Sequence, residues 1–247
     1  MTDFLNVWLP LIVAALIQSS FALGVSMLAL LTGRVLAKSE SAHNLRKLSF
    51  FYVFGSFATT FVLITSTIYI LLQIPIIWYG DRVIFAGAQD YRVWRTLVSI
   101  VIGVGIVILL FYYRRGKKNG TRLQLLPRNA AEYLYERTRV TKQSFEAFIL
   151  GIASIVFELV YIFAPIVIAA NLILNLASAQ QILAIFIYTI ISIVPLVILR
   201  INNRRGGKIS AFQKWREKNK KFLQIAAGVL SIVLGIYLFV YKVLGGY

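Results

Sequence analysis

The sequence contains no cysteine and only one histidine, His43. The lack of cysteine excludes structural disulfides, thiolate metal sites and thiol–disulfide exchange by this chain alone. A single histidine cannot build a multi-histidine metal site, and nothing in the sequence points to a bound cofactor. No Ser–His pair, aspartate pair or zinc motif lies within the apolar segments, so we predict that the protein is not an enzyme.

Charged residues are also scarce. They make up 14% of the 247 residues, whereas 59% are hydrophobic and the mean hydropathy is +0.79. Soluble domains are about 45–50% apolar and about 25% charged, so this composition lies outside the soluble range. The apolar residues come in runs of about 20, the length that crosses a bilayer as a helix. The sequence therefore predicts an integral membrane protein.

We expect the protein to be all-α, because an irregular segment facing lipid would leave backbone N–H and C=O groups unpaired. The predicted transmembrane helices are six, covering residues 7–31, 49–74, 96–113, 145–172, 181–199 and 222–241. The first residues, MTDFLNVW, include an acid and no cationic stretch. This pattern indicates the start of a retained helix rather than a cleaved signal peptide.

Acidic residues are few, and the basic residues are unevenly distributed. Of the 26 Lys and Arg, 22 lie in the three connections 33–47, 114–142 and 200–221. Positively charged connections remain in the cytoplasm, so the distribution predicts six spans with both termini outside the cell membrane. This rule accounts for the net charge of +17, and no nucleic-acid-binding motif accompanies it. We therefore expect no nucleic-acid partner.

Two of the basic connections predict short amphipathic helices. In residues 208–222, KISAFQKWREKNKKF, the apolar Ile209, Phe212 and Trp215 recur every third position between Lys and Arg. Such a helix lies on anionic lipid headgroups, which are the partner that these connections predict. We expect another helix within residues 122–140, RLQLLPRNAAEYLYERTRV.

The six predicted spans divide into two groups of three. Span 96–113 aligns with span 222–241 when Gly103 is placed on Gly228, and spans 7–31 and 145–172 are both rich in small residues and polar at the centre. Three spans per half insert the two halves in opposite senses. We predict inverted repeats at residues 1–113 and 145–247, joined by a basic cytoplasmic linker at 114–144. Such repeats are common in transporters, with the binding site near the midplane.

This 3+3 arrangement and the ending LQIAAGVLSIVLGIYLFVYKVLG resemble the lysine-exporter superfamily. That group includes amino-acid and cation exporters and the membrane domain of the thiol-transferring CcdA and DsbD proteins. The resemblance implies a six-helix fold and a transport-like role, without a substrate. The sequence departs from the CcdA-like members, which carry a cysteine in the first span of each half, and it lacks the acidic ExGD-type motifs of the cation-exchanging members.

An acid, Glu158, interrupts the fourth predicted span. It lies in the otherwise apolar stretch GIASIVFELVYIFAPIVIA, residues 151–169. Glu158 lies twelve residues beyond Glu146, which places it about 18 Å into an apolar core of about 30 Å. A charge at this depth costs several kcal/mol, and intramembrane acids are functional by default. Tyr161 shares its helix face. Pro165 removes a backbone hydrogen bond and is expected to break the helix around Tyr161.

Polar residues of the first two spans complete the predicted substrate or ion site. Gln18, Ser19 and Ser20 lie halfway along the first span, and repeat symmetry would bring them opposite Glu158. Thr59, or its neighbour Thr60, is expected to contribute from the second span. The predicted site residues are Glu158, Gln18, Ser19, Ser20, Tyr161 and Thr59. The competing interpretation is helix packing, in which small residues and hydroxyls fill interfaces and a protonated Glu158 donates an interhelical hydrogen bond.

These observations favour a proton- or cation-coupled secondary carrier or exporter of a small solute. The alternative is a non-transporting scaffold or biogenesis factor that docks a partner through its basic cytoplasmic loops. Either protein is compatible with a homo-oligomer. The two functions differ in what they need, because only the carrier requires Glu158.

Overall fold

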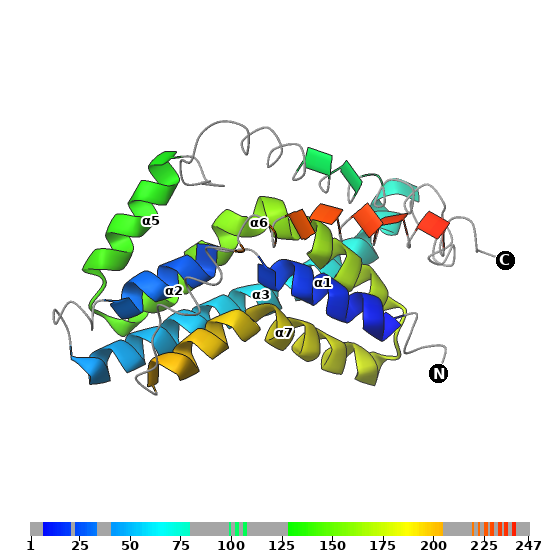
Figure 1. The fold of residues 1–247 in the computed structure, drawn as a ribbon. Helices are drawn as coiled ribbons and strands as arrows, with labels where there is room; N and C mark the ends of the chain where they lie inside the picture. Colours follow the sequence, from blue (N-terminus) through cyan, green and yellow to red (C-terminus); the bar gives the residue numbers. More distant parts are fainter. Residues whose placement is uncertain are drawn as a thin grey trace.

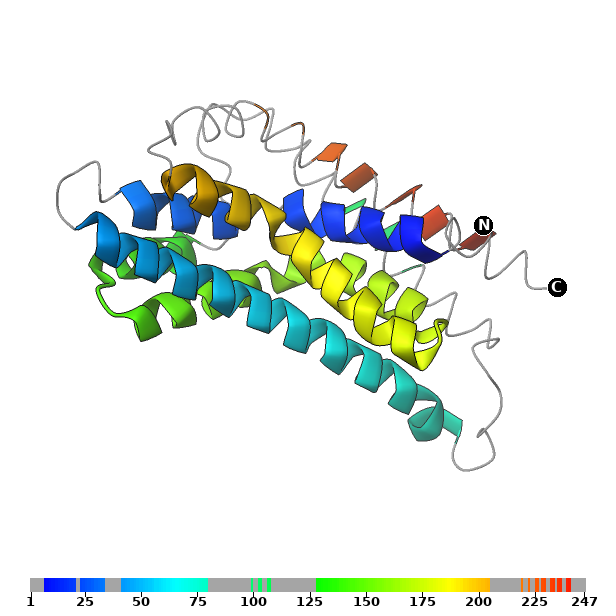
Figure 2. The same cartoon turned by 90° about the horizontal axis from the view of Figure 1, so that it is seen from below.

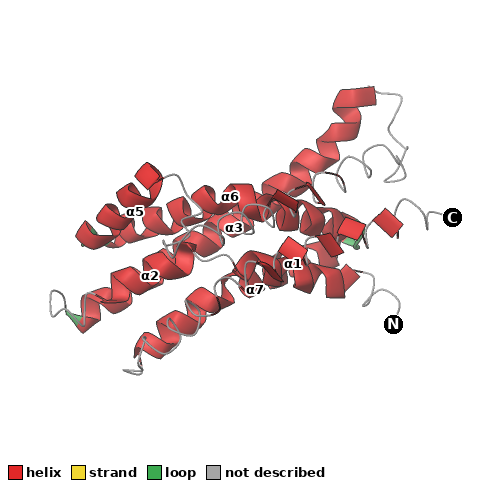
Figure 3. Cartoon of the chain, turned by 45° about the horizontal axis from the view of Figure 1, so that its top comes forward, coloured by secondary structure: helices red, strands yellow, loops and turns green. Residues whose placement is uncertain are grey.

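The computed structural model describes residues 7–20, 23–33, 41–79 and 128–204, with isolated helical positions within 99–107 and 219–240. All elements of this described part are helices, which confirms the all-α class (Figures 1 and 3). They are α1 Leu9–Ser20, α2 Leu23–Gly33, α3 Ala42–Tyr79, α5 Arg128–Val140, α6 Ser144–Leu174 and α7 Ser178–Arg204.

Among the described residues, two helices are long and apolar enough to cross a membrane by themselves, α3 over His43–Leu72 and α7 over Ser178–Ile201. The pair α1 and α2, and the two parts of α6, each reach the same length as a bent pair, which raises the number of candidate spans to four. These four match the first, second, fourth and fifth predicted spans and indicate a membrane protein. Spans 96–113 and 222–241 and the amphipathic segment 208–222 fall largely outside the described residues.

The first predicted span is not one continuous helix. α1 and α2 follow one another along the edge of α7, and their axes differ by 50° (Figure 2). The hydroxyls of Ser19 and Ser20 donate to the carbonyls of Leu16 and Ile17, at 2.8 and 2.7 Å. Serine side chains that bond to the preceding turn bend helices. The prediction of a single helix over residues 7–31 is therefore corrected to two half-helices.

α6 also changes direction within the predicted fourth span. Its parts Ser144–Leu159 and Ile162–Leu174 are bent by 91° relative to one another. Pro165 is buried inside the helix and has no N–H to bond to the carbonyl of Tyr161, four residues earlier. The bend lies between Glu158 and Pro165, in the turn that the sequence predicted to loosen.

The crossing of α3 and α6 is the most extensive helix contact in the described part of the chain. It depends on two glycines. A Cβ atom added to Gly55 would meet the carbonyl oxygen of Phe148, and one added to Gly151 would meet the carbonyl oxygen of Tyr52. The Ser56 hydroxyl donates across the crossing to the Gly151 carbonyl at 3.3 Å. Small residues allow such backbone contact between membrane helices.

The buried apolar side chains form two clusters, one around each half of the first span. The α1 cluster joins α1 to the second part of α6 and the first half of α7, and includes Leu11, Ile17, Ile162, Ala169, Ala184 and Tyr188. The α2 cluster joins α2 to the first halves of α3 and α6 and the second half of α7, and includes Leu28, Leu48, Tyr52, Leu150 and Leu196. Two apolar layers are thus stacked along the bundle.

α5 covers the α2 cluster at one end of the molecule (Figure 1). Leu134 is buried in that cluster, and the Thr138 hydroxyl lies 3.1 Å from the sulfur of Met27 in α2. Arg137 and Arg139 of the same helix remain exposed. A helix within residues 122–140 is therefore present as predicted.

Replacing Leu134 with alanine is expected to detach α5 from the bundle. The Leu134 side chain is 1% exposed, and truncating a buried leucine costs about 2–5 kcal/mol. This loss is of the same order as the packing free energy that holds a helix as short as α5 on the bundle. Hydrogen exchange of the α5 amides should rise at least tenfold. Tyr133→Ala is the control, because its neighbouring side chain is 59% exposed and its loss should leave the exchange unchanged.

Candidate functional site

Buried polar side chains lie where the two apolar clusters meet, and we call this group the polar layer. Its members in the described part of the chain are Gln18, Ser56, Thr60, Ser154, Glu158, Thr189 and Ser192. In α7, for example, Thr189 and Ser192 lie between Tyr188 of the α1 cluster and Ile193 of the α2 cluster. In α7 these polar residues therefore mark the boundary between the two apolar clusters.

Gln18 enters this layer from the last turn of α1. Its side chain is buried, and its Oε1 atom accepts a hydrogen bond from the hydroxyl of Tyr188 in α7. Tyr188 is itself fully buried. A buried hydroxyl or amide needs a partner to avoid a desolvation cost of about 1–3 kcal/mol, so this bond ties α1 to α7.

Glu158 enters the layer from α6, next to a second buried tyrosine. The carboxyl-bearing side chain is only 7% exposed. Tyr52 of α3 lies beside Ser154, one turn before the acid, and close enough to Glu158 to interact with it electrostatically. The Tyr52 hydroxyl also donates to the carbonyl oxygen of Gly24, in the first turn of α2, at 3.0 Å. Tyr52 thus connects the neighbourhood of Glu158 in α6 to α2, the second half of the first predicted span.

Tyr52 and Tyr188 occupy matching positions in α3 and α7, and neither was among the predicted site residues. Each is the eleventh residue of its helix, and each is followed four residues later by a serine, Ser56 or Ser192. Both serine hydroxyls donate back to the tyrosine carbonyl, at 3.1 and 2.8 Å. The repeated Tyr-x-x-x-Ser spacing in the second span of each predicted half was the signal available in the sequence.

Three of the predicted site residues use their hydroxyls within their own helix. Ser19 and Ser20 are partly exposed and bond to the preceding turn of α1. Thr59 is half-buried and donates to the carbonyl of Gly55 at 2.8 Å. These residues shape the helices around the layer. The side chain of Tyr161, also predicted, lies outside the described part of the structure.

Thr60, which the sequence offered as an alternative to Thr59, differs from the other threonines. Each other described threonine donates to the carbonyl four residues earlier, the pattern of Thr32, Thr59, Thr65, Thr67, Thr138, Thr141 and Thr189. Thr60 is fully buried, and its hydroxyl has no hydrogen-bond partner in the described chain. A free hydroxyl is therefore held inside the polar layer, on the α3 face that also carries Ser56.

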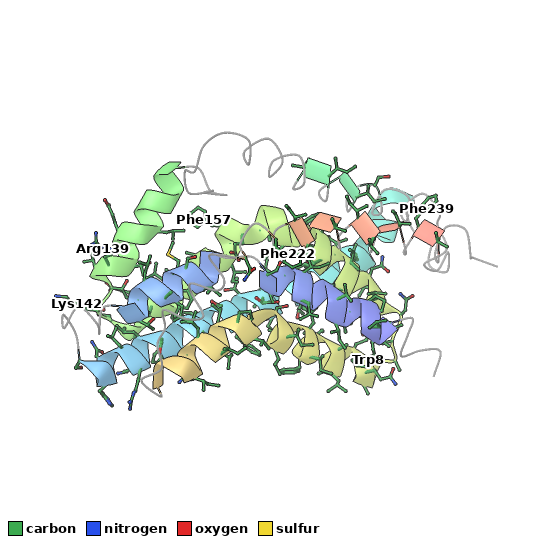
Figure 4. The ribbon with its side chains drawn as sticks, in the orientation of Figure 1. Trp8, Arg139, Lys142, Phe157, Phe222 and Phe239 are labelled. Atoms are coloured by element: carbon green, nitrogen blue, oxygen red, sulfur yellow. The ribbon has the colours of Figure 1, made fainter. Side chains whose placement is uncertain are left out.

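The layer combines one acid with neutral oxygen groups. The cationic side chains of the described residues lie elsewhere, in the first turns of α3, in and after α5, and in the last turns of α7. Figure 4 shows Arg139 and Lys142 at the α5 end, opposite the end that carries Trp8. The guanidinium of Arg200, in the last turns of α7, lies 4.7 Å from the ring centre of Phe50 in α3, at the α5 end. Such a layer suits a proton or a cation better than an anion.

Comparison with known protein families, with curated proteins and with solved structures finds no match to this chain. The function therefore has to be argued from the polar layer and the helices that build it.

Proposed function

We propose that the protein is a secondary carrier that moves a small solute across the membrane, with Glu158 as its proton or cation site. The observation that carries this proposal is the burial of Glu158 inside the bundle, beside Tyr52 of the α2 cluster and between Ile155 and Ile162 of the α1 cluster. An acid in such a place costs several kcal/mol when charged, and packing alone does not require one. A site enclosed on both sides is what alternating access needs.

The two broken spans support the same function. The first predicted span changes direction after Gln18 to Ser20, and the fourth changes direction after Glu158. Carriers bind substrates and ions at discontinuous helices near the midplane, because the ends of half-helices present backbone groups that a continuous helix would bond internally. Both breaks here flank the polar layer.

We infer the inverted 3+3 repeat from the helix contacts. The first span packs against α7, the second span of the other half, and α6 packs against α3 in the corresponding way. Tyr188 of α7 bonds to Gln18 in the first span, and Tyr52 of α3 lies beside Ser154 and Glu158 of α6. This exchange of partners is expected when two halves are related by a pseudo-twofold axis.

We propose the α5 end as the cytoplasmic side, with both termini outside the cell membrane. The described Lys and Arg gather there, as the positive-inside rule requires. The exposed Arg137, Arg139 and Lys142 then face the anionic headgroups of the inner leaflet, each contributing about 1 kcal/mol to membrane attraction.

Transport by the purified chain tests the carrier proposal directly. The protein would be reconstituted in vesicles that contain a pH-sensitive dye, and Na⁺, K⁺, Mg²⁺, Mn²⁺ or lysine would be added outside. We expect at least one of these solutes to change the internal pH in protein-containing vesicles and not in protein-free ones. If none does, the scaffold function becomes the better interpretation of the basic loops.

A further inference from the structure

The two buried tyrosines hold the two halves of the first span separately. Tyr188 belongs to the α1 cluster and bonds to Gln18 in α1. Tyr52 belongs to the α2 cluster and bonds to Gly24 in α2. One half-helix is therefore fastened on each side of the polar layer, by a different helix and through a different apolar cluster.

Each of these bonds favours the closed form of its own side. A phenol enclosed in an apolar cluster has no water to bond, so it needs its protein partner while the cluster is intact. When the half-helix moves away and water enters, both groups are hydrated and the bond loses its advantage. The packing partners of the two half-helices overlap but differ, since α1 lies against α6 and α7, whereas α2 also contacts α3 and α5.

We propose that Tyr188 and Tyr52 are positioning residues that act as two independent latches, Tyr188 closing the α1 side of the polar layer and Tyr52 closing the α5 side. The inference rests on the proposed carrier function, because only a carrier has to open one side at a time. The two tyrosines hold matching positions in α3 and α7, and each bonds to a different half of the first span.

Cysteine labelling can follow the opening of each side, because the chain contains no cysteine of its own. Thr60→Cys is the reporter, since Thr60 is buried in the polar layer and its replacement breaks no hydrogen bond. The probe is a charged, membrane-impermeant methanethiosulfonate applied to either side of sealed vesicles. Ser41→Cys, at an exposed position before α3, identifies the α5 side.

We expect Tyr188→Phe to raise the labelling rate from the α1 side and Tyr52→Phe to raise it from the α5 side. The increase should be roughly 3- to 15-fold, the equilibrium effect of one hydrogen bond between membrane helices. Tyr69→Phe is the matched control, because that tyrosine of α3 is 63% exposed and its hydroxyl fastens no half-helix. The proposal is overturned if both variants open the same side, or if neither changes the rate.

A second variant keeps the test decisive if Tyr188→Phe does not fold. Gln18→Leu removes the acceptor instead of the donor and should open the α1 side equally. Combining it with Tyr188→Phe should add nothing, because both remove the same bond. Labelling needs no solute, so its result is separate from the flux assay. If the tyrosine variants open opposite sides but no solute changes the internal pH, the carrier proposal is rejected and the role of the tyrosines is kept. If solute flux is observed but the variants do not open opposite sides, the role of the tyrosines is rejected and the carrier proposal is kept.

Discussion

Replacing Gly151 with alanine is expected to lower the free energy of unfolding by about 2–4 kcal/mol. The added Cβ would meet the Tyr52 carbonyl, and the backbone nitrogen of Ser56 would lie 2.9 Å from it. These are backbone atoms at the centre of a helix crossing, so neither can rotate away. Overpacking of this kind costs about 1–3 kcal/mol or more, and separating the helices also removes the bond from Ser56 to Gly151.

The same substitution at Gly24 is the control for Gly151→Ala. The atoms nearest to an added Cβ there lie 3.6–3.8 Å away, which is ordinary van der Waals contact. Alanine is also the better helix former by about 1 kcal/mol, so Gly24→Ala should be neutral or slightly stabilising. Unfolding in mixed detergent–SDS micelles measures both variants. Equal stability of Gly151→Ala and Gly24→Ala would show that α3 and α6 do not cross as closely as described.

The sequence predicted the helical class and the two to four candidate spans of the described residues, because these depend on local composition. A run of apolar residues longer than about 18 identifies a membrane helix whatever surrounds it. The turn loosened by Pro165 was also predictable, since a missing N–H acts four residues away. The break of the first span was not predicted, because serines in an apolar run look like packing residues until their bonds to Leu16 and Ile17 are seen.

The contacts of the two buried tyrosines could not be predicted from the sequence, because each contact joins residues that are far apart in the chain. Tyr52 lies 28 residues from Gly24, and Tyr188 lies 170 residues from Gln18. Tyr52 lies near the start of its predicted span, where tyrosine is commonly a membrane anchor, so its place in the sequence favours an interfacial position. Only the packing of four helices shows that these two are buried. Gln18 and Glu158 were therefore identified as polar centres, whereas the residues that surround them were not.

Replacing Glu158 with glutamine is expected to abolish solute-coupled pH change, to the level of protein-free vesicles. Glutamine has the shape of a protonated glutamic acid and still donates and accepts hydrogen bonds, but it cannot release a proton or hold a cation by charge. A carrier that uses Glu158 therefore loses its coupling while its fold is retained. Thermal unfolding of the purified variant in detergent checks that the fold is intact.

Glu146→Gln provides the matched control in the same helix. The Glu146 carboxylate accepts hydrogen bonds from the backbone N–H of Lys142 and Gln143, at 3.1 and 3.5 Å, in a capping box at the start of α6. Glutamine serves in the same box, so this variant should fold and transport normally. Both changes replace one carboxyl group of α6 by an amide, and the two positions differ in depth. If Glu158→Gln also transports normally with unchanged pH dependence, the acid is a protonated packing residue, because a packing role needs only the hydrogen-bonding groups that glutamine retains.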